Sequence, residues 1–179
     1  MKINLFTVIL LLFLSLFYAK RSYSEVFLSP PRQITDTLKK ISVIKKKFTD
    51  INAKISFYKR IERPITGLSA EGGILTSFFE HKDHVKDHLI LYGEMGKTEI
   101  DIYYSKDILF FIYKVDTTYD KPIYNSGFKV KNVSQNRFYF EQNKLFRWIA
   151  PNHKIVSVYA EKFKNEEKSL KELLKQLNE

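Results

Sequence analysis

The sequence contains no cysteine, and it has only six glycines and five prolines in 179 residues. The missing thiols exclude a disulfide scaffold, a thiol nucleophile and any cysteine-ligated zinc or iron–sulfur centre. The low glycine and proline content excludes collagen-like and low-complexity chains. Hydrophobic residues, at 44%, are too abundant for a disordered chain. The composition and length therefore predict one folded domain.

The signatures of common enzymes are also missing. No nucleophile elbow, phosphate-binding loop, dinucleotide fingerprint or metalloprotease motif occurs. Glu99 and Asp101 alternate on one predicted strand face, but charges on the wet face of a sheet are far commoner than paired catalytic carboxylates. We therefore expect no enzyme, with no catalytic residues and no cofactor.

Residues 1–24 have the layout of a secretory signal peptide. A short positive start precedes an almost wholly apolar run over residues 3–19, and Ser22-Tyr23-Ser24 places small residues where cleavage before Glu25 requires them. Two basic residues after the apolar run resist translocation, so an uncleaved N-terminal anchor is the alternative. We predict an exported protein, and an exported protein without disulfides fits a bacterial periplasm better than a eukaryotic extracellular space.

Residues 25–179 are predicted to form a single α+β domain. Ser29-Pro30-Pro31 is typical of a helix entrance. Apolar residues then recur at spacings of three and four, which predicts a basic amphipathic helix within 25–53. These residues are Ile34, Leu38, Ile41, Ile44, Phe48, Ile51 and Ile55. A similar stripe predicts a C-terminal helix over 159–178.

Between the helices, residues 54–150 are predicted to form an antiparallel β-meander of six or seven strands. From Gly72 onward the apolar residues alternate, and turn signals recur at short intervals. The predicted strands are Ile74–Glu80, His84–Tyr92, Thr98–Tyr104, Ile108–Val115, Val133–Glu141 and Lys144–Ala150, with a further one before Pro64. A long loop is expected over Asp116–Lys131.

A weak internal repeat supports the meander. Phe78-Phe79, Tyr103-Tyr104 and Tyr139-Phe140 are each followed by a polar turn containing Asp or Asn and then by an aliphatic residue. Each copy is predicted to be one hairpin, because Asx residues favour turns. The first copy is one residue longer in this scheme, so its turn is expected to differ.

These motifs resemble a family of small, uncharacterised exported bacterial proteins. The resemblance lies in Glu71-Gly72-Gly73, in Gly93-Glu94-Met95-Gly96-Lys97, and in an aromatic hairpin that ends in Arg147-Trp148. It covers about Glu71 to Ala150 and implies an exported meander domain. The family has no known activity, so the resemblance implies no catalytic residue. Gln142-Asn143 departs from the Asn-Gly turn that is more typical of the family.

Three of the four histidines lie close together, between Glu80 and His88, among three carboxylates. On a helix, His84 and His88 would share a face as in a metal site. On a strand they would lie about 13 Å apart, too far to share one ion. The surrounding pattern is strand, turn and strand, so we predict a polar hairpin and no metal site.

The excess positive charge lies in one segment. Between Arg32 and Arg63 there are ten basic and three acidic residues, whereas the rest of the chain after the signal peptide is close to neutral. Such a segment is attracted to anionic head groups, although a solvated lysine face is the commoner explanation. We therefore retain an anionic membrane surface as a partner, besides an unknown protein or envelope component, and expect no nucleic acid. The lysines concerned are Lys39, Lys40, Lys45, Lys46 and Lys47.

The aromatic residues are expected on both faces of the sheet, because adjacent strand residues point in opposite directions. Strict alternation places Leu109 and Phe111 on one face of the sheet and Phe110 on the other. In the last hairpin it places Arg147 on the same face as Leu145, and Phe146 on the same face as Trp148. We expect Ile34, Leu38, Ile41 and Ile44 to pack on the face of Phe111. The opposite face is expected to be partly wet, with Trp148 near its edge and the long loop beside it. Our candidate binding residues are Tyr119, Tyr139, Arg147 and Trp148.

Two functions fit this description. The first is a non-enzymatic envelope protein that binds its partner through an open face of the aromatic sheet. The alternative is a periplasmic carrier or chaperone that cradles a lipid or apolar ligand under a helix. The first predicts a filled core and a flat outer face, whereas the second predicts a cavity lined by Phe and Tyr between sheet and helix.

Overall fold

The computed structural model describes residues 32–178, and it confirms the α+β class. The signal peptide, its cleavage site and Ser29-Pro30-Pro31 lie outside the described residues, as does the side chain of Ile34. Helix α2 spans Arg32–Ala53. From Asp36 onward the chain belongs to the same compact unit as the sheet, and the fold described here is that of this unit.

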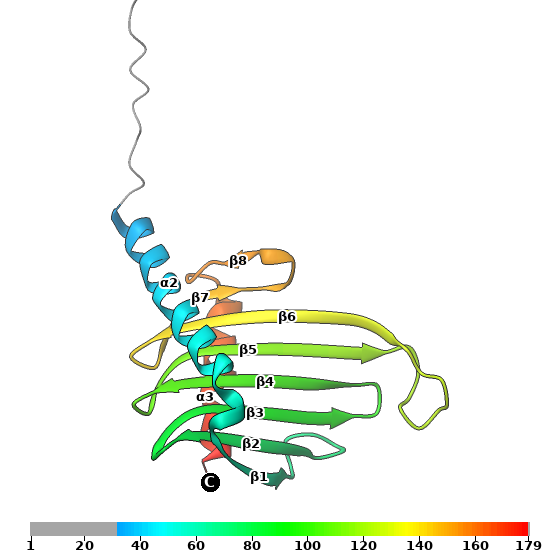
Figure 1. The fold of residues 1–179 in the computed structure, drawn as a ribbon. Helices are drawn as coiled ribbons and strands as arrows, with labels where there is room; N and C mark the ends of the chain where they lie inside the picture. Colours follow the sequence, from blue (N-terminus) through cyan, green and yellow to red (C-terminus); the bar gives the residue numbers. More distant parts are fainter. Residues whose placement is uncertain (1–31, 179) are drawn as a thin grey trace, which may run out of the picture. The chain divides into compact units, whose positions relative to one another are not determined.

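One antiparallel sheet of eight strands forms the centre of this unit, and neighbouring strands follow one another in sequence (Figure 1). The strands are β1 (Lys59–Ile65), β2 (Gly73–Glu80), β3 (Asp83–Gly93), β4 (Gly96–Ser105), β5 (Ile108–Tyr119), β6 (Val130–Glu141), β7 (Lys144–Ile149) and β8 (Ile155–Val156). Short 3₁₀ helices, η1 (Ile55–Phe57) and η2 (Pro151–His153), precede β1 and β8. The meander follows from the short connections, since two-residue loops join only antiparallel strands.

The sheet is larger than the sequence indicates. β8 is a two-residue strand that pairs with the end of β7, and it has no periodicity of its own to reveal it. β5 continues to Tyr119 and β6 begins at Val130, so the long loop shrinks to residues 120–129. The extensions are rich in Asp, Thr, Asn and Lys, and they pair although they lack an apolar alternation. Tertiary pairing therefore overrides the local signal.

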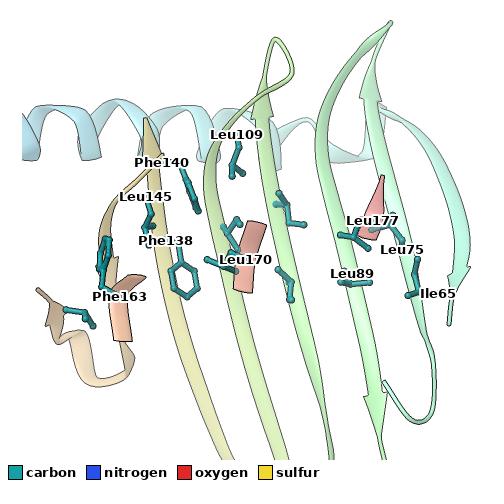
Figure 2. Packing of buried hydrophobic residues seen from close by; sticks show 14 residues of the cluster. Ile65, Leu75, Leu89, Leu109, Phe138, Phe140, Leu145, Phe163, Leu170 and Leu177 are labelled. Carbon is teal, nitrogen blue, oxygen red and sulfur yellow. The ribbon is translucent and has the colours of Figure 1, made fainter. Parts of the chain in front are cut away.

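The two helices cover opposite faces of the sheet. α2 lies in front of the strands in Figure 1, and α3 (Glu161–Leu177) lies behind them. The expectation of a partly wet opposite face is therefore wrong, because α3 packs Phe163, Leu170 and Leu177 onto it. This larger core includes residues from all eight strands and is shown in Figure 2.

On the other face, Ile41 and Ile44 of α2 are buried as expected. Leu38, by contrast, is 55% exposed, so the expectation that it packs on the sheet is wrong. The buried stripe of α2 continues instead through Phe48 and Ile51. Of the described helices, none combines the length and the apolar character that crossing a bilayer requires.

Bulges in three hairpins break the strict alternation. Val85, Phe110 and Phe146 have no partner in the ladder, and each is the third residue of its strand. An inserted residue turns the following side chains to the other face. Phe110 therefore joins Phe111 under α2, while Leu109 faces α3. The expected separation of Phe110 from Phe111 is wrong.

The bulge at Phe146 likewise changes which side chains of β7 face each helix. Leu145 and Trp148 face α3, whereas Phe146 and Ile149 pack under α2. Arg147 lies directly opposite Tyr139 in the ladder and so shares its face. Both expected groupings, Arg147 with Leu145 and Phe146 with Trp148, are therefore wrong.

The three repeated hairpins are real, and all have two-residue loops. The loops are His81-Lys82, Lys106-Asp107 and Gln142-Asn143, so the expectation that the first copy is longer is wrong. In the second and third loops both residues have positive φ, as type I′ turns require. In the first, only His81 does, so its turn does differ.

Two substitutions in the last loop are expected to have opposite effects on stability. Gln142→Gly relieves a left-handed backbone, with φ 49°, and should raise the free energy of unfolding by about 0.5 kcal/mol. Asn143→Gly relieves a similar strain but removes the Oδ1 that accepts the backbone N–H of buried Leu109 at 3.0 Å. It should lower the free energy of unfolding by about 1 kcal/mol. Urea denaturation of both variants is the measurement, and equal shifts would contradict the role of the Asn143 amide.

Candidate functional site

The face under α2 carries a cluster of aromatic rings. Phe48 of α2 meets Tyr103 and Phe111 edge to face, at centroid distances of 5.2 and 5.5 Å. Phe111 in turn lies 5.0 Å from the ring of Tyr139. Such pairs stabilise beyond the area they bury. The helix is thus anchored to strands β4, β5 and β6 along one apolar stripe.

A groove of about 580 Å³, here called the Tyr139 groove, opens beside this stripe. Its floor and walls are mainly aromatic and aliphatic, and its polar groups are few. The lining residues are Ile44, Lys45, Phe48, Thr49, Phe111, Tyr113, Arg137, Tyr139, Ile149 and His153. This size and mixture are typical of small-molecule sites. No carboxylate belongs to the lining, so the groove is electropositive.

A second groove, of about 670 Å³ and here called the hairpin groove, lies on the other side of α2. It runs toward the β4–β5 and β6–β7 loops, and Ile44 lines both grooves. Two of its lysines lie over phenyl rings, Lys40 over Phe146 and Lys47 over Phe110, at 6.0 and 5.5 Å. Its lining includes carboxylates, and Glu141 pairs with Lys40 at 2.8 Å. The hairpin groove is larger, but its cations are partly neutralised.

A polar network fixes the C-terminal half of α2. Lys86 Nζ lies 3.0 Å from Asp101 Oδ1, and His88 Nδ1 lies 2.8 Å from the same atom. The side chain of Asn52 joins Tyr103 and Lys86 to the helix. Burial works to raise the pKa of Asp101, but the hydrogen bond of His88 and the charge of Lys86 outweigh it, so this pKa is lowered. Asp101 is thus held as an anion between Lys86 and His88.

A second buried carboxylate lies on the α3 face. Asp87 accepts hydrogen bonds from Ser77 at 2.5 Å and from Tyr104 at 3.2 Å, and His84 Nε2 lies 2.8 Å away. Burial, followed by the charge of Asp87, raises the pKa of Tyr104. Ser77 and His84 both contact the same oxygen of Asp87, which is not the relay that activates a nucleophile. The arrangement stabilises a buried charge.

The histidine cluster is divided between the two faces. His81 lies in the loop, and the predicted strand–turn–strand arrangement is confirmed. His84 stacks on Tyr104 at 4.6 Å on the α3 face, whereas His88 contacts Asp101 on the α2 face. The bulge at Val85 does not bring them together. Within residues 32–178, no three His, Asp or Glu side chains are grouped as metal ligands would be.

Two of the four candidate binding residues lie together. Tyr139 lines the Tyr139 groove, and Arg147 is its partner in the β6–β7 ladder. Trp148 lies on the opposite face, where its Nε1 donates to Asn136 at 2.9 Å. Tyr119 is buried against Phe128 at the far end of β5, about 26 Å along the strand from the level of Phe111. The structure therefore gives no single site containing all four.

The five lysines of the basic segment differ in their surroundings. Lys46 pairs with Asp50 at 2.6 Å, and Lys47 donates to Ser105 at 3.4 Å. Lys39 and Lys45 have no ion-pair partner among the described residues and line the two grooves. Attraction to an anionic membrane surface through these lysines stays a prediction.

Sequence reasoning missed Arg137, Phe48 and Phe111 as site residues. Arg137 lies two residues before Tyr139, so strand alternation alone places it on the same face. The contribution of Phe48 depends on where α2 crosses the sheet, for which the sequence contains no signal. Comparisons with protein-family models, with curated proteins and with solved structures gave no match. The argument for function therefore depends on the geometry of the site.

Proposed function

We propose that this protein is a non-enzymatic carrier that holds an anionic amphiphile in the Tyr139 groove, between α2 and the sheet. The observation that carries the proposal is the groove itself: about 580 Å³, lined by four aromatic side chains and by cations without a carboxylate. An alkyl chain would lie against the rings, and its charged end would lie among Lys45 and Arg137. The combination favours a ligand that is apolar at one end and negative at the other.

The arrangement of layers supports a carrier over an open-faced interaction module. α2 covers the aromatic cluster and α3 covers the larger core on the opposite face, while the sheet extends beyond both helices toward the β5–β6 loop (Figure 1). An interaction module that binds through an open aromatic face requires its rings to be exposed, whereas Phe111 and Tyr139 are buried between α2 and the sheet. A carrier requires a hollow between helix and sheet, lined by Phe and Tyr, and the Tyr139 groove has this composition.

The cellular setting is part of the proposal. Export to a bacterial periplasm depends on the signal peptide, and the resemblance to small exported proteins points the same way. An amphiphile carrier has an obvious use in an aqueous compartment between membranes. Attraction of the exposed α2 lysines to anionic lipids would bring the groove close to a source of such ligands.

A blocking substitution tests the site. Thr49 is exposed on α2 and lines the groove, so Thr49→Trp places an indole over it without removing a core residue. Calorimetric titration with dodecyl phosphate below its micellar concentration should show an affinity reduced by roughly tenfold or more. The matched control is Ser42→Trp, which is exposed on the same helix and lines neither groove.

Circular dichroism should show that both variants fold like the wild type. Equal binding by the Thr49 and Ser42 variants would place the ligand elsewhere. If the wild type binds neither dodecyl phosphate nor an uncharged amphiphile of the same chain length, the carrier function itself is wrong.

A further inference from the structure

Arg147 is half-buried at the end of the aromatic cluster, and the Nε of its guanidinium has no hydrogen-bond partner. Its Nε is inaccessible to solvent and makes no hydrogen bond, and among the described residues it is the only buried side-chain nitrogen or oxygen of this kind. Neither Arg147 nor Arg137 forms an ion pair with any carboxylate of residues 32–178. A guanidinium in such a position ordinarily meets a carboxylate or a phosphate, which its planar fork fits.

The ladder places the two arginines around one tyrosine. Arg147 is directly opposite Tyr139, and Arg137 is two residues before Tyr139 on β6, so all three project toward α2. The bulge at Phe146 is what turns Arg147 to this face. Arg137 lies over the ring of Tyr113 at 5.4 Å, and its other contact is the amide oxygen of Gln135 at 3.3 Å. Its charge is therefore not neutralised.

The hydroxyl of Tyr139 adds a neutral donor. It makes no hydrogen bond with the described residues, and Tyr139 lines the groove. Burial raises the pKa of Tyr139, and the charges of Arg137 and Arg147 oppose that rise without cancelling it. The phenol is therefore protonated at neutral pH and has a hydrogen to donate. Two guanidinium groups thus flank one phenol on this face of β6 and β7, and none of the three has a carboxylate partner among the described residues.

We propose that Arg147, Arg137 and the Tyr139 hydroxyl form an oxyanion site that binds a phosphate or carboxylate group. The inference depends on the proposed carrier function in one respect, since it assigns the head group of the ligand whose chain lies in the Tyr139 groove. The tetrahedral or planar oxygens of the anion accept from the three donors. The hairpin groove lacks this arrangement, because Lys40 there already forms an ion pair with Glu141.

The test compares ligands with and without a charge. Wild-type protein and the variants Arg147→Gln, Arg137→Gln and Arg60→Gln are titrated with dodecyl phosphate, dodecanoate, monolauroylglycerol and inorganic phosphate. Arg60 lies on edge strand β1, where it pairs with Glu62, and serves as the arginine control. We expect the wild type to bind both anionic amphiphiles roughly tenfold more tightly than monolauroylglycerol.

Arg147→Gln should remove that preference and leave the affinity for monolauroylglycerol within about twofold of the wild type. Arg147→Lys, which keeps the charge but loses the fork, should be intermediate and guards against a loss caused by misfolding. The inference is overturned if Arg147→Gln and Arg137→Gln bind dodecyl phosphate as the wild type does, or if the wild type has no preference for the anionic ligands.

The titration with inorganic phosphate distinguishes a free anion from the head group of an amphiphile. Binding of phosphate that is lost in Arg147→Gln, together with no binding of any amphiphile, would retain the oxyanion site for a free anion and reject the carrier function. Binding of monolauroylglycerol without preference for either anionic ligand would retain the carrier function and reject the oxyanion site. Absence of all binding would reject both.

Discussion

Replacement of Phe138 by alanine is expected to lower the free energy of unfolding by about 3–5 kcal/mol. Phe138 is 0% exposed and stands on β6 between Ile112 and Trp148, with its ring 5.5 Å from that of Trp148. Phe138 belongs to the same buried cluster as Phe140, Leu145 and Phe163 of α3, which are labelled around it in Figure 2. The cavity left by the truncation therefore cannot close by local collapse. Denaturant unfolding at equilibrium measures the loss.

Phe57→Ala is the control for this truncation. Phe57 lies in η1 and is 85% exposed, so its loss should change the free energy of unfolding by no more than about 0.5 kcal/mol. A cost below about 1 kcal/mol for Phe138→Ala would mean that the α3 face is not a close-packed core. That outcome would return the sheet to the half-wet arrangement expected from sequence.

The strands and helices were predictable because their signals are local. Alternation of apolar residues and short turn segments indicated β2 to β7, and the spacing of Ile41, Ile44 and Phe48 indicated α2. What alternation cannot indicate is an inserted residue. Phe110 and Phe146 each occupy a bulge, so each shares a face with the residue that follows it, and the alternation before the bulge does not continue after it. The adjacent aromatic pairs could be recognised in the sequence, but the bulge that follows each pair could not.

The candidate site was only partly predictable for the same reason. Tyr139 and Arg147 were singled out, and the structure places them directly opposite each other in the β6–β7 ladder. Arg137 could have been predicted as well, because strand alternation places it on the same face as Tyr139. The contacts of Asn52 with Tyr103 and Lys86 join residues 51 and 34 positions apart, and only the packing of α2 across the strands determines them.

The bulges connect the fold to the site. They turn Phe110, Phe146 and Arg147 toward α2. This face of the sheet therefore carries both additional aromatic rings and a positive charge. The α3 face receives Leu109 and Leu145 instead and becomes a conventional aliphatic and aromatic core. One face of the sheet thus provides stability, and the other retains grooves and uncompensated charge.

The polar network beneath α2 gives the second large effect. Lys86→Met should lower the free energy of unfolding at pH 7 by about 2–4 kcal/mol, because it removes the lysine that pairs with Asp101 in a largely buried position. The side chains of Lys86 and Asp101 are 10% and 21% exposed, and Lys86 also lies 5.0 Å above the ring of Tyr103. Lys97→Met is the control, since the more exposed pair of Lys97 with Glu99 should be worth less than about 1 kcal/mol.

The dependence of this loss on pH distinguishes the ion pair from simple packing. Asp101 has a pKa below its ordinary value of 3.8 in the folded protein, so its contribution is complete above about pH 4 and is lost as the pH falls through the folded pKa. The stabilities of the wild type and of Lys86→Met should therefore converge in acid. In a double-mutant cycle at pH 7, Asp101→Asn should remove most of the cost of Lys86→Met. A cost that stays constant from pH 7 into acid, or that is unchanged in the Asp101→Asn background, would show that Lys86 acts through its aliphatic stem against Tyr103 and not through Asp101.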